Sequence, residues 1–502
     1  MFRKSLIAAA LALSSCQSNS QPVPVTTPGE AFANEHLLFD MKDEVSGFPC
    51  LVSGTVPVWL SGALLRNGPA KFQVEDKRVE WFDGLAMLHV FEFSSGQVAY
   101  SNRFLRSEQY FIMMDEKSLE FSGFAQDPCP KVFKDQISKE IPASMKGIHN
   151  ADVSIQAYAD QMVALTEVPM PVVFDPETLE TVGNFQYQDK LVQGQWESAH
   201  PQRDPITGET VNYFIRFGRE TSYVVWKMEN GEAGRSVIAE IPVKRPSYMH
   251  SFALTEHYVV LVEFPFVVNP NDLRDKKKPF IFNYQWKPEL GTEFLVIERS
   301  SGKSFKIKGD PFFAFHHVNV FDKEGKIYID IITHPNANIM NVVTDQVDDQ
   351  KSIEESETTR LQRFTIDVAQ QGLKSETLFD QTTELPRIAS ERVAQEYQYC
   401  YAVDMRFPTT MQAKPALYQI DVNAKTAKSW SEEGCFPGEP IFVARPGATK
   451  ENDGVVLSVV LDFARNSSFL LVIDANGFNE IARAKVPNPI PVGLHGLWDA
   501  KK

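Results

Sequence analysis

The chain has 502 residues, 43% of them hydrophobic and 23% charged, which is the balance of a globular protein. Its 50 basic and 65 acidic residues give a formal net charge of -15, which argues against nucleic acid as a partner because phosphate binding needs a basic surface. The length allows two or three ordinary domains, or one large all-β domain.

The N-terminus has the features of an export signal. Arg3 and Lys4 precede an apolar run, residues 6–13, that is too short to span a bilayer. The run ends in a Leu-Ser-Ser-Cys motif that resembles a bacterial lipobox, so we expect residues 1–16 to be a lipoprotein signal peptide with lipidation at Cys16. The alternative is a secretory signal in which this cysteine is incidental.

A polar stretch separates this signal from the folded part. Residues 17–34 are rich in Pro, Thr and Ser, which predicts a flexible tether, and residues 35–502 are expected to form a single domain. Gln17, directly after the cysteine, resembles the signal of outer-membrane lipoproteins. We therefore expect an exported protein in the cell envelope, on the periplasmic side of the outer membrane rather than at the inner membrane.

From about residue 51 onward, the chain consists of short β-branched and aromatic runs bounded by Gly, Asn, Asp or Pro, which is typical of strands. The clearest runs are residues 211–215, 258–262, 326–331, 455–460 and 469–473. Turn sequences at residues 204–208 and 322–325 predict hairpins. Helices are expected at residues 130–140 and 353–363 at most. The acidic stretch at residues 344–359 is expected to be a solvated loop or a surface helix.

Many short strands with few helices predict a sandwich, a barrel or a propeller. The length favours a propeller, because about 470 residues over seven blades give about 65 residues per blade. No internal repeat is visible, so periodicity alone does not establish this fold. The cysteines after the signal, Cys50, Cys129, Cys400 and Cys435, form no CxxC pair and no zinc spacing. In an exported protein they could pair or remain buried thiols.

Four of the ten histidines stand in distinctive settings, each close to Gly, Pro or an apolar residue; they are His200, His250, His316 and His495. Such settings are expected at buried strand ends, where an imidazole must satisfy both ring nitrogens. For any one of them alone, a hydrogen-bonded core histidine is the commoner case. No HExxH motif or facial-triad spacing identifies a metal, but ligands from four distant strands would leave no short signature.

Longer motifs add information that single histidines lack. Residues 62–69 (GALLRNGP) and 81–89 (WFDGLAMLH) are similar to the opening signature of the carotenoid cleavage oxygenase family. The four histidine contexts match its iron-ligand contexts in order, and residues 436–443 and 453–458 match as well. The resemblance covers residues 44–498. It implies an all-β fold, a seven-bladed β-propeller with a cap of loops and short helices over an axial iron site.

By that resemblance, one Fe(II) per chain is held by four histidines; the implied ligands are His200, His250, His316 and His495. Three carboxylates are implied as acceptors for the outer N–H groups of ligand rings; they are Glu167, Glu384 and Glu439. Such acceptors fix the imidazole tautomer and place partial negative charge near the metal. The alternative for each glutamate is a surface or salt-bridged side chain.

Two further positions follow from the same resemblance. His317 neighbours a ligand and takes second rank, because the family pattern uses the first histidine of the pair. Val153 falls where the family places a small β-branched residue against an open iron position. The remaining histidines are expected to be structural or exposed; they are His36, His89, His149, His257 and His334.

The resemblance also implies a reaction, the cleavage of a C=C bond of a carotenoid or apocarotenoid by dioxygen to two carbonyl products in an apolar tunnel. Residues 126–133 and 481–497 look most like the animal-type group, which holds β-carotene-cleaving enzymes and the retinoid isomerohydrolase of vision. Three alternatives stay open: a non-oxidative isomerohydrolase, a stilbene-cleaving dioxygenase and an iron-free carotenoid-binding propeller. The presence of all seven site residues counts against the last.

Two apolar segments are candidates for contact with a membrane. Residues 110–114 and 264–268 could form a patch for extracting a lipid-soluble substrate, or could be core strands. The expected partners are therefore dioxygen, an apolar polyene, and a membrane surface reached through the lipid anchor and the patch.

Overall fold

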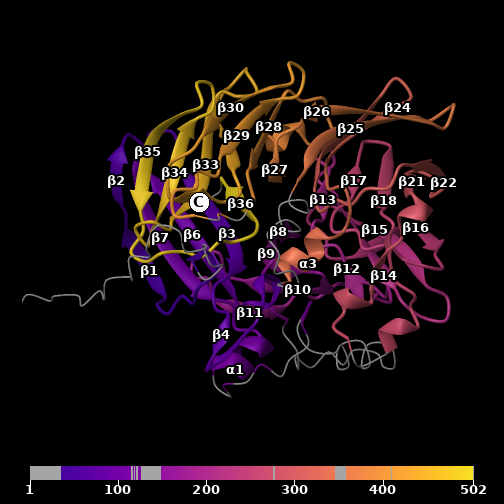
Figure 1. The fold of residues 1–502 in the computed structure, drawn as a ribbon, viewed down its shortest axis with the longest axis horizontal. Helices are drawn as coiled ribbons and strands as arrows, with labels where there is room; N and C mark the ends of the chain where they lie inside the picture. The colour runs from indigo at the N-terminus through magenta and orange to yellow at the C-terminus, as the bar shows by residue number, and fades with distance from the viewer. Residues whose placement is uncertain are drawn as a thin grey trace, which may run out of the picture.

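The computed structural model shows a ring of seven β-sheets, the blades of a propeller, which confirms the predicted fold (Figure 1). The structure describes residues 36–114, 117, 119, 123–125, 149–274, 278–344, 358–406, 408 and 410–500. The expected signal peptide and tether, Cys129, the helix at residues 130–140 and most of the acidic stretch lie outside the described residues.

Blade 1 combines strands from both ends of the described chain. Its sheet has the order β1-β7-β6-β3-β36, with bounds β1 (Val45–Pro49), β3 (Gly62–Pro69), β6 (Ala86–Ser94), β7 (Gln97–Phe104) and β36 (Gly496–Asp499). Strands β3 and β36 are antiparallel and place Arg66 opposite Gly496. This pairing closes the ring, and Figure 1 shows the yellow C-terminal strands beside the indigo N-terminal ones.

Blades 2 to 4 follow in chain order. Blade 2 consists of β8 (Ser154–Tyr158), β9 (Gln161–Thr166), β10 (Val168–Phe174) and β11 (Thr181–Asn184). Blade 3 consists of β12 (Trp196–Glu197), β13 (Gln202–Arg203), β14 (Thr210–Arg216), β15 (Ser222–Met228) and β16 (Arg235–Pro242). Blade 4 consists of β17 (Ala253–Leu254), β18 (Tyr258–Glu263), β21 (Thr292–Glu298) and β22 (Ser304–Gly309).

Blades 5 to 7 complete the ring. Blade 5 consists of β23 (His317–Lys323), β24 (Lys326–Thr333), β25 (Arg360–Asp367) and β26 (Gly372–Phe379). Blade 6 consists of β27 (Glu384–Arg387), β28 (Tyr399–Val403), β29 (Leu417–Asp421) and β30 (Thr426–Trp430). Blade 7 consists of β31 (Cys435–Pro437), β32 (Ile441–Ala444), β33 (Gly454–Asp462), β34 (Ser467–Asp474), β35 (Asn479–Lys485) and the early strand β2 (Leu51–Gly54).

Short elements decorate the blades. Two ribbons pair β4 (Gln73–Val74) with β5 (Lys77–Arg78), and β19 (Phe266–Val267) with β20 (Gln285–Trp286). The helices are α1 (Glu108–Met114), α3 (Ile339–Val343), and the 3-10 turns η2 (Trp81–Asp83), η3 (Asp272–Arg274), η4 (Ile281–Asn283), η5 (Pro288–Leu290) and η6 (Ser390–Arg392). Within the described ranges, none of these helices has the length and apolar character needed to cross a bilayer.

Burial explains why the strands have the sequences they have. The middle strands β18 and β33 lie between neighbouring blades and are buried on both faces, so each is an almost continuous apolar run. The outer strands β26 and β30 are mostly exposed and carry polar residues. All five strand runs predicted from the sequence are strands in the structure: β14, β18, β24, β33 and β34.

One prediction of local structure is wrong, and one alternative that the sequence left open is decided. The helix expected at residues 353–363 fails at its C-terminal half, because β25 begins at Arg360 and pairs with both β24 and β26. The segment at residues 264–268 is buried, so it is core and not a surface patch. In the other segment, by contrast, Phe111 is 49% exposed and Met114 is 37% exposed. Cys50, Cys400 and Cys435 are free thiols in this structure.

Candidate metal centre

Seven side chains meet near the axis of the ring, one from each blade. His495, His200, His250 and His316 come from blades 1, 3, 4 and 5, and each directly precedes or lies beside a strand at the inner edge of its sheet. Glu167, Glu384 and Glu439 come from blades 2, 6 and 7. The structure thus brings together all seven residues that the sequence motifs singled out.

The four histidines form one cluster. One ring nitrogen of each lies within 4.8 Å of the corresponding nitrogen of the other three. The Nε2 atoms of His200 and His250 are 2.9 Å apart, and those of His316 and His495 are 3.2 Å apart. Three of the rings are buried, and His200 is half-buried.

Hydrogen bonds on the outer side of three rings determine their tautomers. The Nδ1 atoms of His250 and His495 donate to Glu167 and Glu439, each over 2.7 Å. Nδ1 of His316 donates to Glu384 over 2.5 Å. An ionised carboxylate can only accept, so each Nδ1 carries the proton and each Nε2 presents a lone pair to the cluster.

The protonation states agree with this arrangement. Burial lowers the pKa of His495 to about 3, and it also lowers the pKa of His316 and His200, so these rings are neutral near pH 7. Burial by itself would raise the pKa of Glu384, but attraction to His316 and the hydrogen bonds from that ring outweigh burial and lower it. The pKa of Glu439 is lowered in the same way, with Arg387 as the strongest opposing influence.

These residues fit a divalent metal ion. Lone pairs that face each other over 2.9 and 3.2 Å repel unless a cation lies between them. Two imidazole nitrogens bound at right angles to one ion, each about 2.1 Å from it, lie about 3 Å apart. An all-imidazole donor set suits Fe, Cu, Ni or Zn better than Mg or Ca, which prefer oxygen ligands.

Further side chains hold the carboxylates. Glu439 accepts hydrogen bonds from the guanidinium groups of Arg66 and Arg387, the latter over 2.6 Å. Glu167 accepts from the Tyr248 hydroxyl over 2.8 Å and from the Trp196 indole over 3.2 Å. Glu439 and Glu167 therefore differ in environment. Glu439 is held by two charged guanidinium groups, whereas Glu167 is held, besides His250, by the neutral Tyr248 hydroxyl and Trp196 indole.

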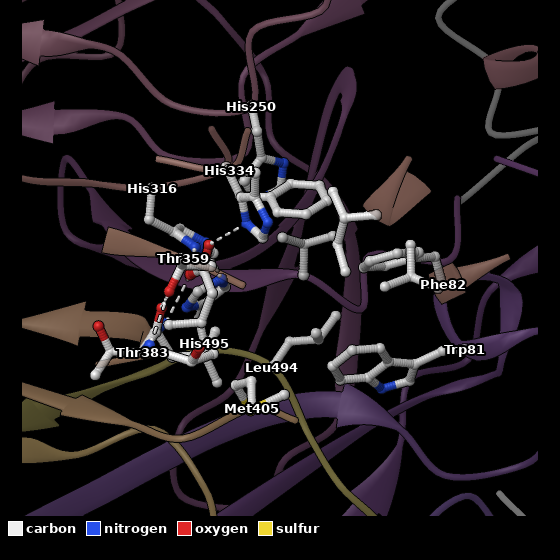
Figure 2. Close-up of a pocket in the computed structure, with 17 residues that line it drawn as sticks. Trp81, Phe82, His250, His316, His334, Thr359, Thr383, Met405, Leu494 and His495 are labelled. Carbon is white, nitrogen blue, oxygen red and sulfur yellow. Dashed lines mark hydrogen bonds and ion pairs between the residues drawn. The ribbon is translucent and has the colours of Figure 1, made fainter. Parts of the chain in front are cut away.

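An apolar pocket of about 70 Å³ lies against the cluster (Figure 2). Trp81, Phe82 and Leu494 form its wall, and His250, His316 and His495 line its opposite end. Val153, which is 6% exposed, also lines this pocket, and its carbonyl accepts a hydrogen bond from the backbone N–H of His495. The pocket can hold a short apolar segment in contact with the histidine cluster.

His334 takes part in the site although no sequence motif indicated it. His334 was expected to be structural or exposed, but it lines the pocket and its Nε2 lies 3.4 Å from Glu384 (Figure 2). It stands just after β24, where no sequence motif marks it. The roles of Arg66 and Arg387 were missed as well, since arginines in strands are usually surface residues.

The other histidines lie outside the cluster. His89 is buried and hydrogen-bonds Tyr100 over 2.8 Å, and His257 pairs with Asp322 at the surface. Burial lowers the pKa of His149 to about 4. His317 directs its Nδ1 to Ser251 and lines a second cavity rather than the apolar pocket.

Comparison with known proteins gives consistent matches over almost the whole chain. The family model described as retinal pigment epithelial membrane protein matches residues 38–500. The chain is 31% identical to the mitochondrial carotenoid-cleaving dioxygenase of Macaca fascicularis, covering 92% of this chain and 94% of that protein. It is 32% identical to the chloroplastic carotenoid cleavage dioxygenase 8 homolog B of Oryza sativa subsp. japonica, covering 90% and 82%.

Solved structures agree with the sequence comparisons. A cobalt-substituted apocarotenoid oxygenase of Synechocystis is 26% identical and superposes with a TM-score of 0.78, covering 92% of this chain and 97% of that one. A variant of the same Synechocystis protein gives a TM-score of 0.80 at 25% identity, covering 93% and 99%.

Proposed function

Because this chain belongs to the carotenoid oxygenase family, we propose that it cleaves a C=C bond of a carotenoid or apocarotenoid with dioxygen and yields two carbonyl products. The observation that carries the proposal is the cluster of four imidazoles, three of them fixed by carboxylates, at the end of an apolar pocket. The proposed cofactor is one Fe(II) per chain, with four ligands: His200, His250, His316 and His495.

Fe(II) bound there would supply the electron-transfer chemistry that dioxygen needs before it can react with a polyene. The three carboxylates hold the protons on Nδ1 of His250, His316 and His495, which keeps the Nε2 lone pairs of these three rings available for the cation. A site of four neutral donors leaves the positive charge of the cation intact, and the buried Glu167, Glu384 and Glu439 compensate it from outside the ligand set.

The pocket residues position the substrate. Trp81, Phe82 and Leu494 hold an apolar chain against the cluster by dispersion and exclude water from the reacting carbons. Val153 sits beside the cluster, where its branched side chain limits how closely a chain can approach. Which double bond lies at the histidines then depends on how far the chain extends along the pocket wall.

The apolar wall of the pocket suits an oxygenase better than a simple hydrolase. Its described residues include no serine, cysteine or lysine, and Glu384 is engaged by His316 and His334. Three threonines also line it, and the hydroxyl of Thr359 donates to the Thr383 carbonyl. A hydrolase would need a nucleophile activated by an adjacent base or an activated water.

The deciding experiment is turnover of a carotenoid panel under labelled dioxygen, with products identified by mass. We expect one dioxygen consumed per bond cleaved, labelled aldehydes or ketones, and no turnover under strict anaerobiosis. Equal turnover without oxygen, giving a geometrical isomer and a free fatty acid, would overturn the oxygenase proposal in favour of an isomerohydrolase.

The proposed location follows from the N-terminal motif and the surface of α1. A lipid at Cys16 would hold the protein at the envelope membrane, and the exposed side chains Phe111 and Met114 could contact the bilayer that supplies the polyene.

A further inference from the structure

A second cavity reaches the same histidines from another side. Its volume is about 500 Å³, against about 70 Å³ for the apolar pocket. His316 and His495 line both cavities, whereas His250 lines only the apolar pocket and His200 lines only the second cavity. The histidine cluster therefore stands between two separate spaces.

The second cavity has a mixed wall, polar and apolar in about equal parts, and it connects the cluster with the surface. Gln202 and Ser251 contribute neutral polar groups, and the guanidinium of Arg387 is paired there with Glu439. Its rim includes Glu391 and Ala500, which are exposed, while Glu439 at its inner end is 1% exposed. Water and small ions can thus approach the buried cluster past more polar groups than the apolar pocket offers.

His317 lines this cavity, and its ring carries a buried lone pair. The Ser251 hydroxyl donates its proton to the Phe315 carbonyl over 2.7 Å, so toward His317 Nδ1, 2.8 Å away, it must accept. Nδ1 of His317 therefore carries the ring proton, and Nε2 bears the lone pair. That Nε2 is buried and has no hydrogen-bond partner among the described residues, which is unusual for a buried polar atom.

We propose that this second cavity is the route by which the divalent metal ion enters and leaves the four-histidine site, with His317 Nε2 as a transient ligand when its ring turns toward the cavity. The inference rests on the proposed metal centre but not on the reaction carried out there. It assigns the two cavities to different species: the apolar pocket receives the polyene, and the second cavity admits the cation.

Desolvation energies separate the two routes. Moving a bare dication through an apolar pocket carries a large desolvation cost, whereas a wider cavity with polar groups lets it keep part of its hydration shell. The net charge of -15 also raises the local concentration of cations around the protein. A polyene gains nothing from these polar groups and is held better by Trp81 and Phe82.

The test measures metal exchange rather than turnover. Ala444 is half-buried on β32 and lines the second cavity, so Ala444→Trp should narrow it. The matched control is Ala424→Trp, at an exposed position outside the cavity. His317→Phe removes the lone pair but keeps a ring, and His257→Phe, at a surface histidine, is its control.

Metal-free full-length protein is mixed with Co(II), binding is followed by absorbance, and release is followed by competition with a chelator. Ala444→Trp should slow association and release alike by about tenfold or more, which leaves Kd unchanged within about twofold, because a narrowed route raises only the barrier. His317→Phe should slow both rates by about threefold or more, and the two controls should match the unsubstituted chain.

Each outcome decides a separate question. If the unsubstituted chain binds no metal, both the proposed metal centre and the proposed entry route are wrong. If metal binds and both cavity variants exchange it at the unsubstituted rate, the route alone is wrong. Slower exchange in Val343→Trp, which fills the apolar pocket, with normal exchange in Ala444→Trp, would also overturn the route. Should Ala444→Trp fail to fold, His317→Phe decides.

Discussion

Replacing Glu439 by glutamine is expected to destabilise the fold more than the same change at Glu167. The Glu439 side chain is fully buried and accepts hydrogen bonds from Arg66, Arg387, His495 and the backbone N–H of Gly496. Glutamine has one acceptor oxygen in place of two, and its amide N–H groups would face guanidinium donors.

The expected loss of unfolding free energy depends on how far the arginines that lose their carboxylate partner can be hydrated. The Arg66 side chain is only 7% exposed, so its charge cannot recover hydration, whereas Arg387 is 34% exposed and partly can. Removing one partner of a buried ion pair costs about 3–5 kcal/mol. At Glu167 the other partners are the neutral Tyr248 hydroxyl and Trp196 indole, so the loss should be about 1–3 kcal/mol.

Metal affinity should respond differently from stability. Both glutamates orient one histidine, so each substitution should weaken metal binding about 10- to 100-fold. Denaturant unfolding of the metal-free proteins gives the stabilities, and chelator competition gives the affinities. Equal losses of unfolding free energy in Glu439→Gln and Glu167→Gln would refute the argument that the buried arginine determines the difference.

Three further changes test other parts of the molecule. His495→Ala should sharply lower the metal content measured by elemental analysis, and full occupancy would contradict its assignment as a ligand. Cys16→Ser should abolish lipid attachment and release the protein into the soluble envelope fraction; an unprocessed, lipid-free wild type in the cytoplasm would exclude the lipoprotein. Burial raises the pKa of Glu197 to about 7, so the native state keeps a proton that the unfolded state loses earlier. Stability should therefore fall by up to about 3 kcal/mol as pH rises from 4.5 to 7. Glu197→Gln should remove that part of the slope in urea unfolding, and an unchanged slope would argue against the shift.

The sequence predicted the long strands well and the short ones poorly. Strands such as β18 and β33 are buried on both faces, which leaves a continuous apolar run that is easy to recognise. The inner strands β12 and β17 have two residues each, too few to show any period. Residues 360–363 were predicted as helix because their pairing partners in β24 and β26 are not visible locally.

The residues of the candidate site also fall into those that the sequence identified and those that only the fold brings together. The four histidines and three glutamates were identified because each stands in a motif that resembles the family, and the structure brings all seven together. His334 reaches Glu384 only through the fold. Arg66 likewise meets Glu439 across 373 positions of the chain, a distance that no local pattern can encode.

The contribution of one group per blade has a consequence for how the protein assembles. His200, His250 and His316 belong to consecutive blades, but His495 reaches the cluster only when β36 pairs with β3 and closes the ring. A partly folded chain with an open ring therefore has an incomplete ligand set. Such closure joins residues far apart in sequence and belongs among the slow steps of folding. Tight metal retention should accordingly appear late, so that metal content distinguishes completely closed molecules from nearly folded ones.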